Sequence, residues 1–321
     1  MRTKFPYIVL ALLIVGIWGV TFISTKVLLA EGLSPEAIFF LRFAIAYCGI
    51  TLFSLLSGKG YKMWSDNVQD EFYLCLLGIA GGSLYFYSEN KALAYTQACD
   101  VSFIVCTSPL LMVLLAFLLR AVLPGKYAAK VEKVNVTPKL VLGTVLAIVG
   151  TAVVLFDGAR FAVSEKALLG DILALVASLT WAIYSIYVGN MTKKYGPLFT
   201  TRKVFFYGLL TIVPFTIHNF PSTEILFKPA VLYNILFLGL VASLACYALW
   251  NVVLVRLGGV TATNLIYLNP FFTLVAAVTV LGEKLTPTAA IGSAILVIGV
   301  ILATYKHSNH CKHSNHKDIQ K

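Results

Sequence analysis

The sequence predicts an all-α membrane protein with ten transmembrane helices arranged as two inverted five-helix repeats. Three observations predict this fold: an unusually apolar composition, ten apolar segments of membrane-spanning length, and an ordered match between the two halves of the chain. Of the 321 residues, 59% are hydrophobic and 12% are charged, and the mean hydropathy is +0.86. Because soluble domains carry about 25% charged residues, this composition favours lipid as the solvent.

The ten apolar segments each approach the roughly 20 residues that a helix needs to cross the hydrocarbon core. Proline and glycine punctuate the gaps between them, as at Ser34-Pro35 and Gly196-Pro197. No gap is long enough to hold a soluble domain. The predicted segments are residues 7–27, 36–57, 72–95, 98–120, 138–157, 167–190, 200–219, 231–254, 260–281 and 287–305.

The basic residues predict the orientation in the membrane. With a cytoplasmic N-terminus, basic residues of the inner loops outnumber those of the outer loops by about three to one, as the positive-inside rule requires. An even number of helices also returns the lysine-rich tail to the cytoplasm. The net charge of +11 is spread over short loops and forms no basic domain, which argues against nucleic-acid binding. We expect a multi-pass protein of the bacterial inner (plasma) membrane with both termini in the cytoplasm.

The two halves of the chain match each other at an ordered set of positions. The matched pairs keep one order along five successive helices and include Trp18/Trp181, Arg42/Arg202, Gly78/Gly239, Asn90/Asn251, Pro109/Pro270, Gly143/Gly292 and Gly150/Gly299. Because each half holds an odd number of helices, the second half must enter the membrane from the opposite side. Such inverted repeats permit alternating access to a central site. The predicted repeats are residues 7–157 and 158–305, followed by a His-rich tail at 306–321 that we expect to be disordered.

Glycines mark one predicted contact between helices. Gly143 and Gly150 are seven residues apart, as are Gly292 and Gly299. Residues at this spacing share one helix face, and small residues allow membrane helices to approach closely. The sequence therefore predicts close packing along these faces, with a contact between the two halves.

Several of these features together resemble a known family. They are Trp18-Gly19, Arg42-Phe43, the stretch around Asn90, the two prolines, the turn from Leu281 to Thr286, and the paired glycines of the last helix in each half. Over residues 7–305 the chain resembles the paired EamA-type domains of the drug/metabolite transporter superfamily. The resemblance implies a ten-helix fold and the export of small metabolites or amino acids. The first half departs from the pattern, because a loop from Pro124 to Val136 replaces the Gly-Glu-Lys-Leu-Thr turn.

Pro109 and Pro270 fall near the middle of two predicted helices and are predicted hinges. Each proline removes a backbone donor and frees a carbonyl about one turn earlier. Irregular backbone at this depth is tolerated where it packs in protein or lines a cavity. Asn264, Tyr267 and Asn269 lie around the second proline and offer hydrogen bonds to a substrate. A simple helix kink remains the alternative.

Arg42 and Glu89 are charged residues within predicted membrane segments. Such residues are costly and are candidates for function by default. Glu89 has Trp250 as its counterpart in the second half, so this carboxylate occurs in one half only. It is a candidate for binding a substrate amine or for proton coupling, and we expect it to lie at the depth of Arg42. The alternative is that both side chains reach toward the membrane surface.

Aromatic residues complete the predicted binding site. Trp18 and Trp181 lie inside their segments, whereas interfacial aromatic residues lie at helix ends. A cavity lined by them suits apolar or aromatic metabolites, although packing or lipid contact is the alternative for each aromatic residue. The full predicted substrate-binding set is Trp18, Arg42, Tyr85, Glu89, Asn90, Trp181, Tyr184, Asn251, Asn264, Tyr267 and Asn269.

The sequence offers no motif for catalysis or for direct use of ATP. It has no GxxxxGK[ST], no HExxH and no Ser/His/Asp set, so we expect no enzyme activity and no cofactor. The tail repeats Lys-His-Ser-Asn-His around Cys311, which leaves weak metal binding open as an alternative to a solvated tail. The sequence predicts a secondary transporter or facilitator with a small-molecule substrate, in contact with membrane lipids. A flippase-like lipid-handling protein is the alternative, and proton coupling and homodimer formation stay open.

Overall fold

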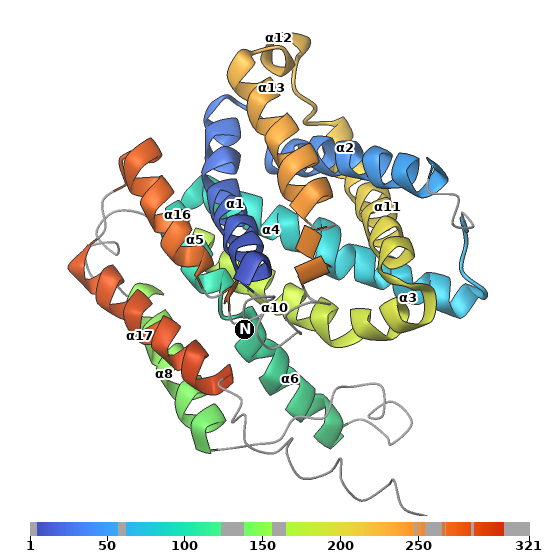
Figure 1. Ribbon diagram of the computed structural model, residues 1–321. Coiled ribbons are helices and arrows are strands. Elements are labelled where there is room, and N and C mark those ends of the chain that lie inside the picture. The colour runs from blue at the N-terminus through green and yellow to red at the C-terminus, as the bar shows by residue number, and fades with distance from the viewer. Residues whose placement is uncertain are drawn as a thin grey trace, which may run out of the picture.

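The computed structural model describes residues 5–56, 62–122, 138–155, 165–246, 249–250, 252–253, 265–266, 268–283 and 286–304. Throughout these ranges the regular structure is helical and no strand occurs (Figure 1). The predicted all-α class is therefore confirmed. Five described helices are long and apolar enough to cross a membrane, and shorter apolar helices accompany them.

The helices of the first half follow the predicted segments closely. Their bounds are α1 Phe5–Ala30, α2 Pro35–Leu56, α3 Val68–Gly78, η1 Ile79–Ser83, α4 Leu84–Tyr95, α5 Ala98–Val105, α6 Ser108–Val122 and α8 Pro138–Leu155. The run from α3 through the π-helical turn η1 to α4 is continuous and corresponds to one predicted segment, residues 72–95.

The helices of the second half contain more interruptions. Their bounds are α10 Glu165–Tyr195, α11 Pro197–Ile217, α12 Thr223–Leu226, α13 Pro229–Leu236, η2 Phe237–Ala245, α16 Asn269–Ala276, η3 Ala277–Leu281 and α17 Pro287–Thr304. Gly196 separates α10 from α11 with a φ of 85°, a conformation that only glycine adopts without strain. The Pro124–Val136 loop and the tail lie outside the described residues.

Each of the two predicted hinge prolines stands at the start of a helix. The segment predicted as one helix from 98 to 120 consists of α5 and α6, separated by the turn Cys106–Thr107. Pro109 is the second residue of α6, and Pro270 is the second residue of α16. Proline is favoured in the first helical turn, because the N–H that it lacks would have no partner there. The Val105 carbonyl, which the sequence predicts to be freed, accepts a hydrogen bond from Ser108 Oγ.

Helices α8 and α17 lie side by side at one edge of the molecule (Figure 1). A Cβ atom at Gly150 would lie 2.4 Å from Leu296 N and 2.7 Å from the Gly292 carbonyl. Reciprocally, a Cβ atom at Gly299 would lie 2.4 Å from Ala147 N and 2.7 Å from the Gly143 carbonyl. The predicted packing of the glycine faces is confirmed, and it joins the last helices of the two halves.

Two further glycines bring π-helical segments close to their neighbours. Gly78 precedes η1, and its Cβ position lies 2.5 Å from Tyr207 Cβ on α11. Gly239 lies within η2, and its Cβ position is 2.9 Å from Ile45 Cβ on α2. At Gly78 the third segment of the first half thus packs on α11, the second segment of the second half. At Gly239 the third segment of the second half packs on α2, the second segment of the first half.

Candidate substrate-binding site

The first part of the candidate site surrounds Arg42 of α2. The Arg42 side chain is buried, and its Nε donates a 2.7 Å hydrogen bond to Ser243 Oγ in η2. Its guanidinium carbon lies 4.9 Å from the centre of the Phe86 ring and 5.3 Å from that of Phe43. A cation over desolvated aromatic faces is stabilised by the ring quadrupole. The Arg42 side chain therefore lies inside the protein, between Ser243 of η2 and the aromatic rings of Phe43 and Phe86.

Glu89 of α4 lies near this cation. Glu89 is 7% exposed. Its carboxylate accepts a hydrogen bond from Tyr85 and is attracted by the positive charge of Arg42. The charge of Arg42 on α2 therefore meets the charge of Glu89 and the phenol of Tyr85, both on α4, within the apolar interior. The structure brings together three of the residues predicted for the substrate site.

An aromatic group continues the site from Tyr85. The Tyr85 and Trp181 ring centres are 4.9 Å apart, and those of Trp181 and Tyr184 are 5.1 Å apart. The Tyr184 ring fits against η1 because Gly81 has no side chain, since a Cβ atom there would lie 2.4 Å from the ring. Tyr85, Trp181 and Tyr184, all predicted site residues, form one aromatic cluster with the carboxylate of Glu89 at its edge.

Trp18 of α1, the counterpart of Trp181, contacts residues of the second half of the chain. Its Nε1 donates a 3.0 Å hydrogen bond to the Ala242 carbonyl in η2. Its ring centre lies 5.2 Å from that of Trp250. The Trp18 ring therefore packs at a tilt against Trp250, the counterpart of Glu89, whereas the Trp181 ring packs at a tilt against Tyr85, one turn from Glu89 itself.

Polar groups gather where the helices are interrupted. Thr107 Oγ1 and Ser178 Oγ of α10 are 2.7 Å apart, and Ser108 Oγ lies 3.1 Å from the same Ser178 atom. Asn269 begins α16, and its buried Oδ1 has no hydrogen-bond partner within the described part of the chain. A buried acceptor without a partner costs free energy, so Asn269 is suited to receive a donor from a ligand.

Asn90, a further predicted site residue, is not part of this arrangement. Asn90 is buried, and its Nδ2 donates a 3.0 Å hydrogen bond to the Pro35 carbonyl. This bond fastens α4 to the first residue of α2, which is a structural contact. Asn251, Asn264 and Tyr267 lie outside the described residues.

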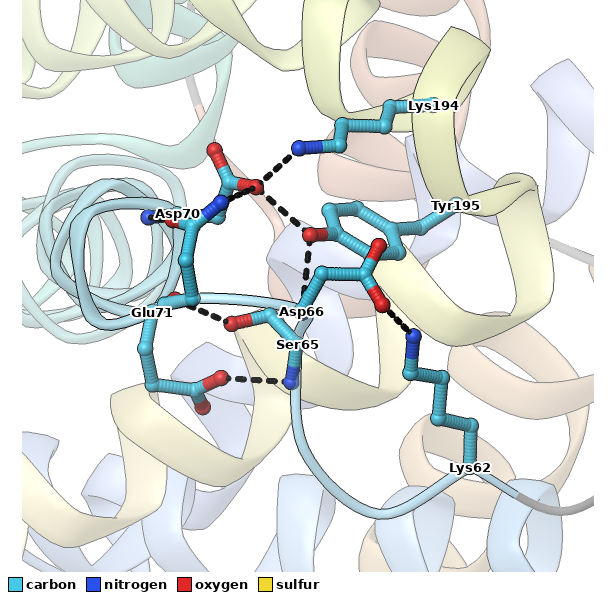
Figure 2. Close-up of polar contacts among 8 residues, drawn as sticks. Lys62, Ser65, Asp66, Asp70, Glu71, Lys194 and Tyr195 are labelled. Carbon is cyan, nitrogen blue, oxygen red and sulfur yellow. Dashed lines mark hydrogen bonds and ion pairs between the residues drawn. The ribbon is translucent and has the colours of Figure 1, made fainter.

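A polar cluster that the sequence analysis missed joins the start of α3 to the end of α10. Figure 2 shows Asp70 Oδ2 accepting hydrogen bonds from Lys194 and, at 2.6 Å, from Tyr195. Tyr195 Oη in turn accepts a 3.0 Å hydrogen bond from the Asp66 amide, and Lys62 pairs with the Asp66 carboxylate. The hydrogen bond from Lys62, together with the charge of Lys62, holds the pKa of Asp66 below its usual range.

The neighbouring carboxylate extends this cluster to α11. Glu71 accepts a 2.9 Å hydrogen bond from the Ser65 amide and pairs with Lys203, and Tyr207 donates to it. The 62–67 loop is thereby tied to two helices of the second half. No short-range pattern links Asp70 to Tyr195 or Glu71 to Tyr207, because the members of each pair are more than 120 residues apart in the sequence.

A second site that the sequence analysis missed lies in the turn after η3. Gly282 has a φ of 64°, which directs the chain back toward the protein at Glu283. The Glu283 carboxylate lies 2.7 Å from Lys26 Nζ of α1 and accepts a 2.9 Å hydrogen bond from the amide of Ala98, the first residue of α5. Burial alone would raise the pKa of Glu283, but Lys26 and the α5 amides outweigh it and hold the pKa below its usual range.

The lowered pKa of Glu283 gives a pH-dependent contribution to stability. Because the folded-state pKa lies below the unfolded value of about 4.3, the contribution is complete above that value and is lost as the pH falls through the folded-state pKa. The other titratable groups around the carboxylate are Lys26 of α1 and Cys99 and Asp100 of α5. We expect the difference in melting temperature between wild type and Glu283→Gln to be constant from pH 6 to 8 and to shrink below about pH 4. A difference that grows on acidification would contradict the assigned direction.

The chain matches a known protein family in two stretches, one in each half. The model of the EamA-like transporter family matches residues 5–156 and 168–305. The chain belongs to the EamA-like transporter family. This EamA-like protein is therefore a multi-pass membrane transporter, and the family that the sequence motifs resemble is confirmed.

Relatives of this EamA-like protein are named as transporters. An uncharacterized transporter of Archaeoglobus fulgidus is 27% identical over 90% of this chain and 94% of its own length. A protein of Streptantibioticus cattleyicolor named "Probable terminal-alkyne amino-acid exporter" is 27% identical over 71% of each chain. One crystal structure at 20% identity superposes with a TM-score of 0.57, covering 94% of this chain and 98% of that chain, which supports the fold alone.

Proposed function

We propose that this EamA-like protein is a secondary transporter or facilitator. It exports small metabolites, namely amino acids or related compounds, across the bacterial inner membrane by alternating access. The observation that carries the proposal is the site around Arg42 and Glu89. There, two opposite charges and aromatic rings lie together in the apolar interior of the protein, on segments that the sequence predicts to cross the membrane. Charged groups at this depth are retained mainly where they bind or move a solute. The relative named as an amino-acid exporter agrees with this substrate class.

We further propose that ten helices form two inverted repeats, residues 7–157 and 158–305. The reciprocal glycine contacts support this arrangement. The contact of Gly150 with the Gly292 carbonyl is repeated, with the halves exchanged, by that of Gly299 with the Gly143 carbonyl. A two-fold axis lying in the membrane plane would produce such exchanged contacts and would permit alternating access.

The proposed orientation places both termini in the cytoplasm. The end of the protein that carries Asp70 and Lys194 then faces the cytoplasm, and the end that carries Lys26 and Glu283 faces outward. The excess of basic residues in the inner loops supports this orientation. Trp18, Arg42, Tyr85, Glu89, Trp181, Tyr184 and Asn269 are the proposed substrate-binding residues, with Pro109 and Pro270 as hinges.

The test is uptake of a panel of labelled amino acids and related metabolites into proteoliposomes of the purified protein, with and without a proton gradient. We expect saturable flux of at least one water-soluble compound. For that compound, Asn269→Ala should raise the apparent KM about fivefold or more, because a buried hydrogen bond contributes about 1 kcal/mol or more. The matched control is Asn219→Ala, since Asn219 lies at the protein surface and bonds Glu36.

One result would contradict the proposed function, and two others would change only its coupling or its list of binding residues. Movement of labelled lipid without flux of any water-soluble compound would favour the flippase-like alternative. An equal response to the presence and absence of a proton gradient would indicate a facilitator and would remove proton coupling. An unchanged KM in Asn269→Ala would remove Asn269 from the site.

A further inference from the structure

Three elements that are distant in the sequence meet at the carboxylate of Glu283. Its side chain is 7% exposed and lies 2.7 Å from Lys26 Nζ near the end of α1. The same carboxylate accepts hydrogen bonds from the Ala98 amide at 2.9 Å and the Cys99 amide at 3.4 Å. Glu283 therefore connects the turn between η3 and α17 to α1 on one side and to α5 on the other.

These contacts favour a closed arrangement for electrostatic reasons. The first amides of a helix have no partner within the helix, and they carry the positive end of its dipole. A carboxylate placed there receives charge-assisted hydrogen bonds. The carboxylate also neutralises Lys26, whose side chain is 24% exposed. The carboxylate can make both sets of interactions at once only while α1 and α5 lie together.

Helix α5 is the element that Glu283 controls. It has eight residues and ends at the Cys106–Thr107 turn, after which α6 begins in a new first turn. Because no continuous helix joins α5 to α6, α5 can tilt about this turn while α6 stays in place. The inner end of α5 lies at the hydroxyl group pair of Thr107 and Ser178, and Glu283 holds its other end.

We propose that Glu283 is an outer latch, a positioning residue that binds α5 to α1 when the outer end of the transporter is closed and releases α5 when that end opens. The proposal rests on the transport function proposed above. It assigns a role to a carboxylate that does not touch the substrate. In this structure the latch is closed, with both the ion pair and the amide hydrogen bonds formed.

The chain contains its own reporter of latch opening. Cys99 is the second residue of α5, is fully buried, and donates its amide to Glu283. Release of α5 would expose the Cys99 thiol to solvent at the outer end. Cys246, which follows η2, is also buried at 2% exposure and lies away from the latch. It reports general unfolding.

The experiment measures labelling of both thiols by a membrane-impermeant maleimide added to intact cells, with the labelled peptides identified by mass spectrometry. We expect Cys99 to react at least tenfold faster in Glu283→Gln and in Lys26→Met than in wild type, with Cys246 unchanged. Lys26→Arg keeps the positive charge and should react at the wild-type rate. Glu31→Gln is the matched control, because Glu31 pairs with Lys228 at 2.9 Å at the same end of the protein.

Several outcomes would overturn the latch. Wild-type labelling of Cys99 in both Glu283→Gln and Lys26→Met would show that the carboxylate does not hold α5. Equal acceleration of Cys99 and Cys246 in both variants would make Glu283 a general stabilising residue. Labelling of Cys99 only in inside-out vesicles would place the latch at the cytoplasmic end.

Transport measurements separate this proposal from the proposed function. With the latch variants in proteoliposomes, we expect the maximal rate of net export to fall tenfold or more while KM changes less than twofold, since the binding residues are untouched. If wild type transports a compound but the rate of Cys99 labelling is unchanged in the variants, the latch proposal is wrong and the proposed transport function stands. Absence of flux in wild type would remove the transport function whatever the labelling shows.

Discussion

Replacing Glu89 with glutamine is expected to lower transport at least tenfold without unfolding the protein. Glutamine keeps the shape of the side chain and can still accept the hydrogen bond from Tyr85, but it loses the charge that Arg42 attracts. A tenfold loss corresponds to about 1.4 kcal/mol of binding or transition-state stabilisation. The measurement is the initial rate of flux in proteoliposomes across a series of pH values.

The control for this prediction is Glu165→Gln, because Glu165 is an exposed carboxylate at the start of α10. An unchanged rate and an unchanged pH profile in Glu89→Gln would remove Glu89 from both substrate binding and proton coupling.

A double variant of Arg42 and Glu89 tests the pairing of the two side chains through protein stability. Arg42→Met alone leaves a buried carboxylate without its cation, and breaking such a pair costs about 3–5 kcal/mol. The double variant Arg42→Met with Glu89→Gln should therefore be more stable than Arg42→Met.

Adding one methyl group at Gly150 is expected to destabilise the contact between α8 and α17. The new Cβ atom would lie 2.4 Å from Leu296 N and 2.7 Å from the Gly292 carbonyl, and backbone atoms cannot rotate away. Overpacking of this kind costs about 1–3 kcal/mol. We expect Gly150→Ala to lower the melting temperature by about 5 °C, and Gly299→Ala to do the same, because its Cβ atom would lie 2.4 Å from Ala147 N.

The matched control is Gly189→Ala in α10, where no atom from another segment of the described residues lies within 4 Å of the added Cβ. This variant should be as stable as wild type or slightly more stable, because alanine has the higher helix propensity. The double variant Gly150→Ala with Gly299→Ala should cost less than the sum of the two single changes, since one separation of the helices relieves both contacts. Wild-type stability of Gly150→Ala would show that α8 and α17 are not packed as closely as described.

The local features of the fold could be predicted from the sequence, because they depend on residues that are close together in the chain. Apolar runs of membrane-spanning length located the helices, and Pro35 and Pro197 marked helix starts. The matched glycines predicted the packing of α8 on α17. Pro109 and Pro270 predicted irregular backbone in the right places. The sequence did not show that each proline begins a new helix, since that depends on whether the preceding residues stay helical.

Part of the candidate site could also be predicted, because some of its residues are unusual within their own segment of the chain. Arg42, Glu89 and the tryptophans stood out because a charge or a large polar ring within an apolar run is unusual on its own. Asn90 stood out in the same way, yet its amide binds the Pro35 carbonyl. Its residue type shows that a hydrogen bond is needed, but the packing of α4 on α2 decides which group supplies it.

The sequence by itself predicted the all-α class, the membrane as solvent, the family and an ordered match between the two halves of the chain. Only the tertiary structure decided which distant residues become partners. Glu283 meets the Ala98 amide across 185 residues, and Tyr195 meets Asp70 across 125. Hydrophobic periodicity is a local property and fixes each helix separately, whereas an ion pair or a helix cap between segments depends on how several helices pack together.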